Sequence, residues 1–178
     1  MSENDETLKR DKLLLDLMIH VYDEESTRNE LIDSKNNQMI ILSGVMLTLQ
    51  ATLFTEVLVN HIITNNLIIW SFKALSISAM IISVILYLYS MYIFIEAYTF
   101  SDKFMLCPDE QYLLDKAISN ESEFNVQGEI LATMSEVITE NSTVIQSKLD
   151  KGKSGFRWLK RAVFSTLIVI ILFLFALV

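Results

Sequence analysis

Residue types that interrupt helices or cross-link chains are scarce in this sequence. Its 178 residues include one proline, four glycines and a single cysteine, Cys107. One cysteine excludes a disulfide within the chain, and we interpret it as a buried or interfacial thiol. The shortage of proline and glycine favours long, unbroken helices, so the expected fold class is all-α.

Residues that carry common catalytic chemistry are also few. There are two histidines, His20 and His61, and the sequence has no Ser/His/Asp or Cys/His arrangement and no glycine-rich phosphate loop. The acidic run at residues 23–25 lacks the spacing of a calcium loop and is interpreted as a solvated helix face. We therefore expect no enzyme activity, no metal and no other cofactor, and we find no signal for a nucleic-acid partner.

Apolar residues make up 52% of the chain and are gathered in three stretches, at about residues 39–59, 67–97 and 161–178. A bilayer core of about 30 Å needs about 20 helical residues. The first two stretches reach that length, and the third, with about 17 apolar residues, lies at the lower limit. The net charge of −8 belongs almost wholly to the remaining parts. The sequence thus predicts an integral membrane protein with three transmembrane helices in the lipid bilayer.

Lysine and arginine are unevenly distributed around these stretches. Five precede the first stretch, none lies in the connection at residues 60–66, and six lie at or just before the start of the third. Short loops rich in Lys and Arg stay on the cytoplasmic side, so we expect a cell (inner) membrane protein with a cytosolic N-terminus and an external C-terminus. Two Asn-x-Ser/Thr matches, at Asn120 and Asn141, fall in the predicted cytosolic part and are taken as chance. Contact with anionic lipid is a secondary role of the basic cluster before the third stretch.

The parts outside the membrane carry helical patterns. One helix is expected within residues 1–38, running into a two-helix transmembrane hairpin at residues 39–100. In the cytosolic region 101–160 a broad apolar stripe recurs at sevens. Its assembly candidates are Ile130, Met134, Val137 and Val144. Because such a stripe must be covered, we expect a helical cytosolic bundle. A hinge at Gly152 and Gly155 and then the C-terminal transmembrane helix at residues 161–178 are expected to follow it.

Small and hydroxylated residues line one side of each of the first two spans. The pore-lining candidates in the first span are Gly44, Thr48, Gln50, Ala51, Thr52, Thr55 and Glu56. The helix-packing candidates in the second are Ser76, Ala79, Ser83, Tyr87 and Ser90. Such stripes either let helices approach closely or face a water-filled path in an oligomer. The third span lacks comparable polarity and is expected to face lipid.

The order of these parts resembles a known group of proteins. A soluble helix carries Glu24-Glu25-x-x-Arg28 and then Asp33-Ser34-Lys35 directly before the first span, and a proline follows soon after the second span. A cytosolic helix then leads through Lys160-Arg161 into the last span. This arrangement resembles the small transmembrane effectors of prokaryotic antiphage systems, the Pycsar-effector and SLATT-type families. The resemblance implies an oligomeric protein that permeabilises the inner membrane when triggered. No nucleotide-binding domain is recognisable in this chain.

The sequence leads to two functional hypotheses. The first is a homo-oligomeric membrane channel or pore, cation-conducting and gated by its cytosolic helical lobe. Glu56, repeated around such an oligomer, would form a ring of negative charge that concentrates cations at the outer mouth. The alternatives for Glu56 are a carboxylate reaching the membrane surface or an ion pair with Lys73. The second hypothesis is a non-conducting membrane anchor or scaffold that recruits a cytosolic partner.

Overall fold

The computed structural model describes the backbone of residues 3–60, 67–106 and 123–177. Side chains are described for these residues except 3–8, 56–60, 67–69, 72, 73, 101, 102, 123–126, 173, 176 and 177. No strand occurs in the described ranges, and the all-α prediction is confirmed.

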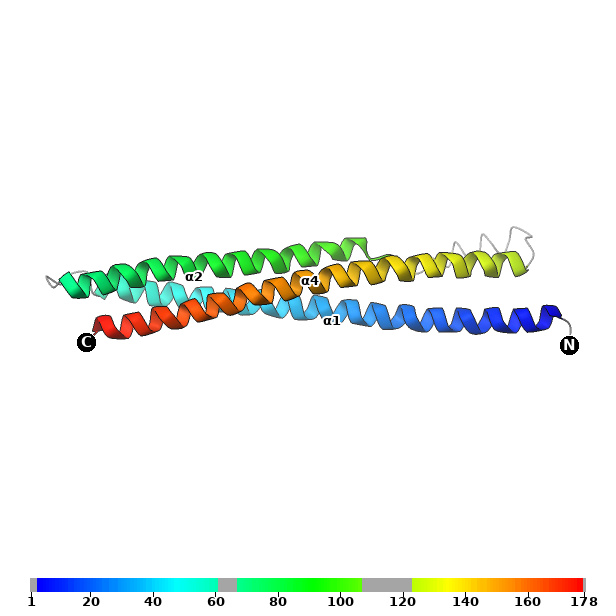
Figure 1. The fold of residues 1–178 in the computed structure, drawn as a ribbon, viewed down its shortest axis with the longest axis horizontal. Coiled ribbons are helices and arrows are strands. Elements are labelled where there is room, and N and C mark those ends of the chain that lie inside the picture. The colour runs from blue at the N-terminus through cyan, green and yellow to red at the C-terminus, as the bar shows by residue number, and fades with distance from the viewer. Residues whose placement is uncertain (1–2, 61–66, 107–122, 178) are drawn as a thin grey trace. The chain divides into compact units, whose positions relative to one another are not determined.

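Three long helices make up most of the described chain (Figure 1). Helix α1 spans Glu3–Asn60, α2 spans Leu67–Thr99 and α4 spans Glu123–Leu177, while a short 3-10 helix, η1, covers Phe100–Lys103. The prediction that the N-terminal helix continues into the first span is confirmed, because α1 is unbroken through both. The predicted hinge at Gly152 and Gly155 does not interrupt the helix, because α4 is helical through both glycines.

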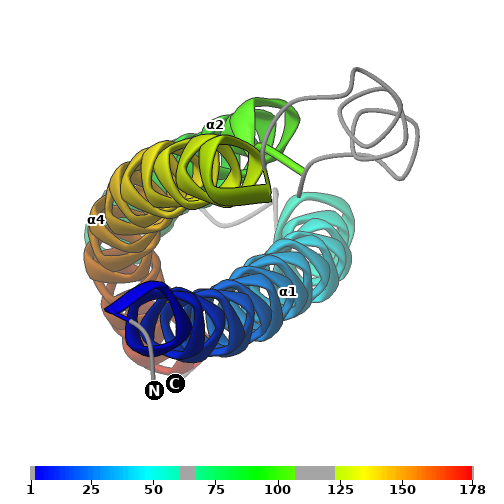
Figure 2. The same cartoon turned by 90° about the vertical axis from the view of Figure 1, so that its right-hand side faces the viewer.

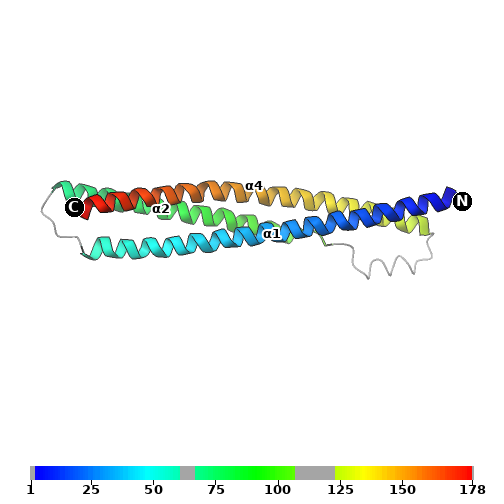
Figure 3. The ribbon, with the colours of Figure 1, turned by 90° about the horizontal axis from the view of Figure 1, so that it is seen from below.

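The chain divides into two compact units. Unit 1 consists of Met1–Asp33 and Thr99–Lys148, and unit 2 of Ser34–Tyr98 and Leu149–Val178. Within unit 2, the parts of α1, α2 and α4 run side by side in both Figure 1 and Figure 3. Figure 2 looks along the helices from the end at which α1 begins.

Buried positions recur every seven residues on all three long helices. On α1 the most regular series is Asn29, Asn36, Ser43 and Gln50. On α2 it is Ser76, Ser83, Ser90 and Ala97, and on α4 it is Met134, Asn141, Lys148, Gly155, Ala162 and Val169. A strict period of seven is the pattern of helices that pack along a continuous seam, as in coiled coils. Many of these seam positions are polar or small, which sets this bundle apart from one with a purely apolar seam.

Small seam residues let the helices of unit 2 approach closely. A Cβ atom added at Gly155 would lie 2.9 Å from the nearest ring atom of Phe94, and the Gly155 carbonyl accepts a hydrogen bond from the Ser90 hydroxyl at 2.8 Å. A Cβ at Gly152 would lie 3.1 Å from Asn36 Oδ1. The fully buried core beside these contacts consists of Tyr87, Phe94, Leu159 and Ala162. The two glycines therefore serve helix packing.

Two helical segments of the described chain are long and apolar enough to cross a membrane. They lie within Lys9–Thr55 of α1 and Ala74–Thr99 of α2. The third predicted span, residues 161–178, is not among them, and its side chains 173 and 176–178 lie outside the described residues. By length and composition, the first two predicted spans meet the requirement of a bilayer.

Candidate functional site

The centre of unit 2 contains a hydrogen-bonded polar cluster contributed by all three helices. Gln50 Nε2 of α1 donates to Ser83 Oγ of α2 at 2.5 Å and to Thr166 Oγ1 of α4 at 2.7 Å. The Tyr87 hydroxyl lies 3.3 Å from Thr166 Oγ1. Each of these four side chains is at most 6% exposed. The cluster thus ties α1, α2 and α4 together at a single level of the bundle.

The Gln50 amide has one polar atom without a partner. Ser83 and Thr166 both direct their hydroxyl groups to the Ala162 carbonyl, at 3.2 and 3.0 Å, so they act as acceptors for Nε2. Gln50 Oε1 is buried and has no hydrogen-bond partner in the described chain. Exchanging the two amide atoms would leave Nε2 unpartnered instead, since the same two hydroxyl groups would face Oε1. The cluster therefore always leaves one amide atom unsatisfied, which limits its net stabilising effect.

The predicted pore-lining residues of α1 separate onto two faces. Gln50 is buried at 2% exposure, whereas Thr48, Ala51, Thr52 and Thr55 are exposed and Gly44 is half-buried. A Cβ atom at Gly44 would meet nothing within 4 Å, so this glycine, unlike Gly155, is not the site of a close contact among the described residues. The side chain of Glu56 lies outside the described residues. We call the exposed set, Thr48, Ala51, Thr52 and Thr55, the threonine face.

The hydroxyl groups of the threonine face are all bonded to their own helix. Thr48 donates to the Gly44 carbonyl at 3.0 Å, Thr52 to the Thr48 carbonyl at 3.1 Å, and Thr55 to the Ala51 carbonyl at 2.9 Å. A hydroxyl oxygen bonded in this way keeps lone pairs that can still accept from water. The face can therefore contact water, another helix or lipid without leaving a donor unpaired.

The helix-packing candidates of α2 lie on its covered side. Ser76, Ser83, Tyr87 and Ser90 are buried, and Ala79 is half-buried. Ser76 Oγ has no hydrogen-bond partner in the described chain. On α4 the expectation of a lipid-facing helix needs correction, because Thr166 is 6% exposed and its hydroxyl joins the polar cluster. The opposite side of this segment is apolar and exposed, including Phe164 and Leu167.

A cavity of about 330 Å³ lies between α1 and α2 in unit 2. It is lined by Leu47, Gln50, Ala51, Phe54, Met80, Ile81, Val84 and Ile85. Almost all of this lining is apolar, and the unpartnered Gln50 Oε1 is itself sealed from solvent. The cavity offers shape and apolar surface but no accessible polar group.

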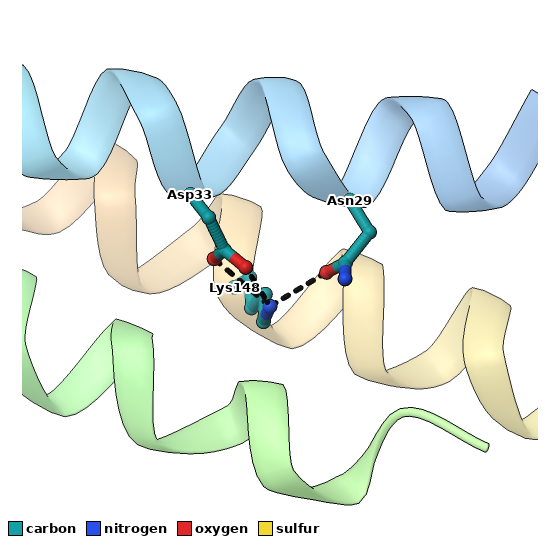
Figure 4. Close-up of polar contacts among 3 residues, drawn as sticks. All are labelled: Asn29, Asp33 and Lys148. Carbon is teal, nitrogen blue, oxygen red and sulfur yellow. Dashed lines mark hydrogen bonds and ion pairs between the residues drawn. The ribbon is translucent and has the colours of Figure 1, made fainter. Parts of the chain in front are cut away.

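Unit 1 contains a buried ammonium group. Lys148 Nζ of α4 donates to Asn29 Oδ1 at 2.6 Å and to both carboxylate oxygens of Asp33 at 2.9 Å, as Figure 4 shows. The Lys148 side chain is fully buried, and that of Asp33 is 16% exposed. Asn29 and Asp33 lie one turn apart on α1, so all three protons of the ammonium reach acceptors on one helix. Full pairing is what allows a charge to remain buried here.

A second buried amide in unit 1 holds the chain that precedes the undescribed residues 107–122. Asn141 Nδ2 donates to the Met105 carbonyl at 2.9 Å, and Asn141 Oδ1 accepts from the Met105 amide at 2.7 Å. Asn141, which begins one of the two Asn-x-Ser/Thr matches, is 0% exposed, so its side chain packs inside unit 1. Of the assembly candidates, Met134 and Val137 are buried, and Ile130 and Val144 are half-buried.

Glu25 is a partly buried carboxylate in unit 1. Its Oε2 atom has no hydrogen-bond partner in the described chain. Burial raises the pKa of Glu25 above its ordinary value, while the positive charge of Arg28 acts in the opposite direction. Among the described residues no three His, Cys, Asp or Glu side chains are grouped to hold a metal ion.

Sequence reasoning missed Thr166, Asn29 and the pairing of Lys148 with Asp33. The seven-residue spacing could have found Asn29 on α1 and Lys148 on α4, which both lie on it, and Thr166 lies seven residues beyond the buried Leu159. Comparison of the chain with family models, curated proteins and solved structures gave no match.

Proposed function

We propose that the chain is an integral membrane protein that assembles into a homo-oligomeric, cation-conducting channel gated by unit 1. In this proposal α1, α2 and the end of α4 cross the membrane, and unit 1 is cytosolic. The conducting path runs between subunits and is lined by the threonine face.

The observation that carries this proposal is the different use of the two polar faces of α1. On one face, Gln50 is hydrogen-bonded inside the subunit to Ser83 and Thr166. Thr48, Thr52 and Thr55 of the threonine face are exposed, and Ala51, also exposed, lines the cavity against α2. Polar residues within a span usually face protein or water, so the surroundings of this face are best supplied by further copies of the chain.

The level of the polar cluster supports the proposed insertion. Gln50 and Ser83 lie near the middle of the first two predicted spans, residues 39–59 and 67–97. In the proposed insertion these two residues of the cluster lie near the centre of the bilayer. Interhelical hydrogen bonds at that depth hold membrane helices together without a hydrophobic driving force.

The second hypothesis, a non-conducting anchor or scaffold, is favoured by a different observation. Every hydroxyl group of the threonine face already donates to a carbonyl of its own helix. Such a face tolerates lipid and needs no water.

The resemblance to antiphage effectors favours the channel, and a role in permeabilising the inner membrane belongs to the same proposal.

The experiment is a cation flux measurement on purified protein in sealed liposomes, together with the subunit number from native mass spectrometry. The test variant is Thr48→Val/Thr52→Val/Thr55→Val, which keeps side-chain shape and removes the hydroxyl groups. We expect an unchanged oligomer and a strongly reduced flux. The control is Ser78→Ala, an exposed hydroxyl of α2 that donates to its own helix and should leave flux unchanged. A wild-type protein that inserts and gives no flux would support the anchor instead.

A further inference from the structure

The six basic residues between Lys148 and Arg161 fall into two groups of three. In the first group each ammonium has a carboxylate partner. Lys148 pairs with Asp33 at 2.9 Å, Lys151 with Glu96 at 2.6 Å, and Lys153 with Asp150 at 3.2 Å. These three charges are balanced within the chain.

The second group consists of Arg157, Lys160 and Arg161, and all three are exposed. None of the carboxylates in the described part of the chain forms an ion pair with them. They directly precede the apolar end of α4, which begins at Ala162. The structure thus concentrates three uncompensated positive charges where α4 becomes apolar.

Two of these three cations lie over aromatic rings. Lys160 Nζ lies 4.7 Å from the centroid of the Phe156 ring, and Arg161 Cζ lies 4.4 Å from that of Trp158. Trp158 is itself held by Tyr89 of α2, with centroids 5.0 Å apart and an interplanar angle of 87°. Both Phe156 and Tyr89 are exposed, at 43% and 46%. Trp and Tyr rings favour the headgroup level of a membrane, where one side is apolar and the other is wet.

We propose that Arg157, Lys160 and Arg161, together with Trp158, form a binding surface for the phosphate groups of anionic phospholipids. The arginine guanidinium groups can bind phosphate oxygens in pairs, and the adjoining apolar surface accepts the acyl chains. A lipid supplies the phosphate in this proposal because the three charges lie next to the apolar end of α4. This inference rests on the membrane insertion in the proposed function and assigns a lipid class to one place on the surface.

The test uses vesicles of phosphatidylcholine that contain either spin-labelled phosphatidylglycerol or spin-labelled phosphatidylcholine. Electron paramagnetic resonance then gives the fraction of each label immobilised by the protein. We expect wild-type protein to prefer phosphatidylglycerol, and Arg157→Gln/Lys160→Gln/Arg161→Gln to lose this preference by about fivefold or more. The control Lys35→Gln/Lys103→Gln/Lys153→Gln removes the same charge from other exposed sites and should keep the preference.

Two outcomes would overturn the inference. One is equal loss of preference in both triple variants, which would show a general charge effect. The other is displacement of the labelled lipid by inorganic phosphate but not by sodium chloride of equal ionic strength, which would identify a soluble phosphate as the ligand. Extraction of wild-type protein from the vesicles by alkaline carbonate would instead contradict the proposed insertion, so the two failures are distinguishable.

Discussion

The Lys148 ammonium of α4 is fully buried and contacts both carboxylate oxygens of Asp33 on α1 at 2.9 Å. Asp33 and Lys148 are also the residues at which unit 1 ends on these two helices. A displacement of one helix by a single turn, about 5.4 Å, would take the ammonium away from at least one of its partners. The pair therefore fixes the register of α1 and α4 within unit 1.

We predict that Lys148→Met destabilises the protein by about 3 to 5 kcal/mol, because it leaves the Asp33 carboxylate without its buried counter-ion. The double variant Asp33→Leu/Lys148→Met should regain most of that loss, since it leaves no unpaired charge. Thermal unfolding followed by circular dichroism provides the measurement. A double variant no more stable than Lys148→Met would show that the unpaired Asp33 carboxylate is not the cause of the loss.

Gly155 provides a test of close packing in unit 2. An added Cβ would meet the Phe94 ring at 2.9 to 3.0 Å, so Gly155→Ala should cost about 1 to 3 kcal/mol. In the Phe94→Leu background the same change should cost less, because the ring no longer occupies that space. Gly128→Ala is the matched control. It meets nothing within 4 Å and should stabilise α4 by up to about 1 kcal/mol. Equal effects of the two alanine substitutions would contradict the packing.

We predict that loss of the Gln50 amide changes the free energy of unfolding only slightly. Gln50→Leu removes two hydrogen bonds but also the unpartnered Oε1, and Ser83 and Thr166 keep the Ala162 carbonyl as a partner. We expect a change in unfolding free energy within about 1 kcal/mol, whereas Gln50→Ala, which also opens a cavity, should cost about 2 kcal/mol or more. Loss of folding in Gln50→Leu would show that the amide is indispensable.

Glu25 makes stability depend on pH in a defined direction. Because burial raises its pKa in the folded state, the folded chain binds more protons than the unfolded chain between the two pKa values. This group's contribution therefore falls as pH rises from the ordinary carboxyl pKa through the raised folded value. Glu25→Gln should remove that part of the pH dependence, while Glu24→Gln, an exposed neighbour, should leave it. Identical pH profiles for wild type and Glu25→Gln would contradict the burial effect.

Much of the fold followed from the sequence, for identifiable reasons. The lack of proline and glycine and the continuous helical spacing predict α1 as one helix, and α1 is one helix. The expected hinge at Gly152 and Gly155 does not interrupt α4, and the sequence could not show this because glycine marks either a bend or a close contact, which composition does not separate. The ring of Phe94, which decides the matter, lies far away in the sequence.

The site was less predictable than the fold. Periodicity groups Gln50 with the neighbouring threonines, but it does not reveal which side of α1 other helices cover. The positive-inside rule treats Lys148 as one of the basic residues that mark the cytosolic side. No residue near Lys148 in the sequence indicates that Asp33, 115 residues earlier, forms an ion pair with it. Thr166 follows Ser165 in an otherwise apolar run, and its role arises only from Gln50, Ser83 and Tyr87 on other helices.

We propose that the threonine face lines a conducting path between subunits. The most direct measurement records single-channel currents from Thr52→Cys in a Cys107→Ala background while a water-soluble, cationic thiol reagent is added. Ile82→Cys, exposed on α2, is the control. We predict cation currents in both variants and a block by the reagent in Thr52→Cys alone. Currents that persist unchanged after complete modification of Thr52→Cys, or the absence of currents from inserted protein, would contradict the account.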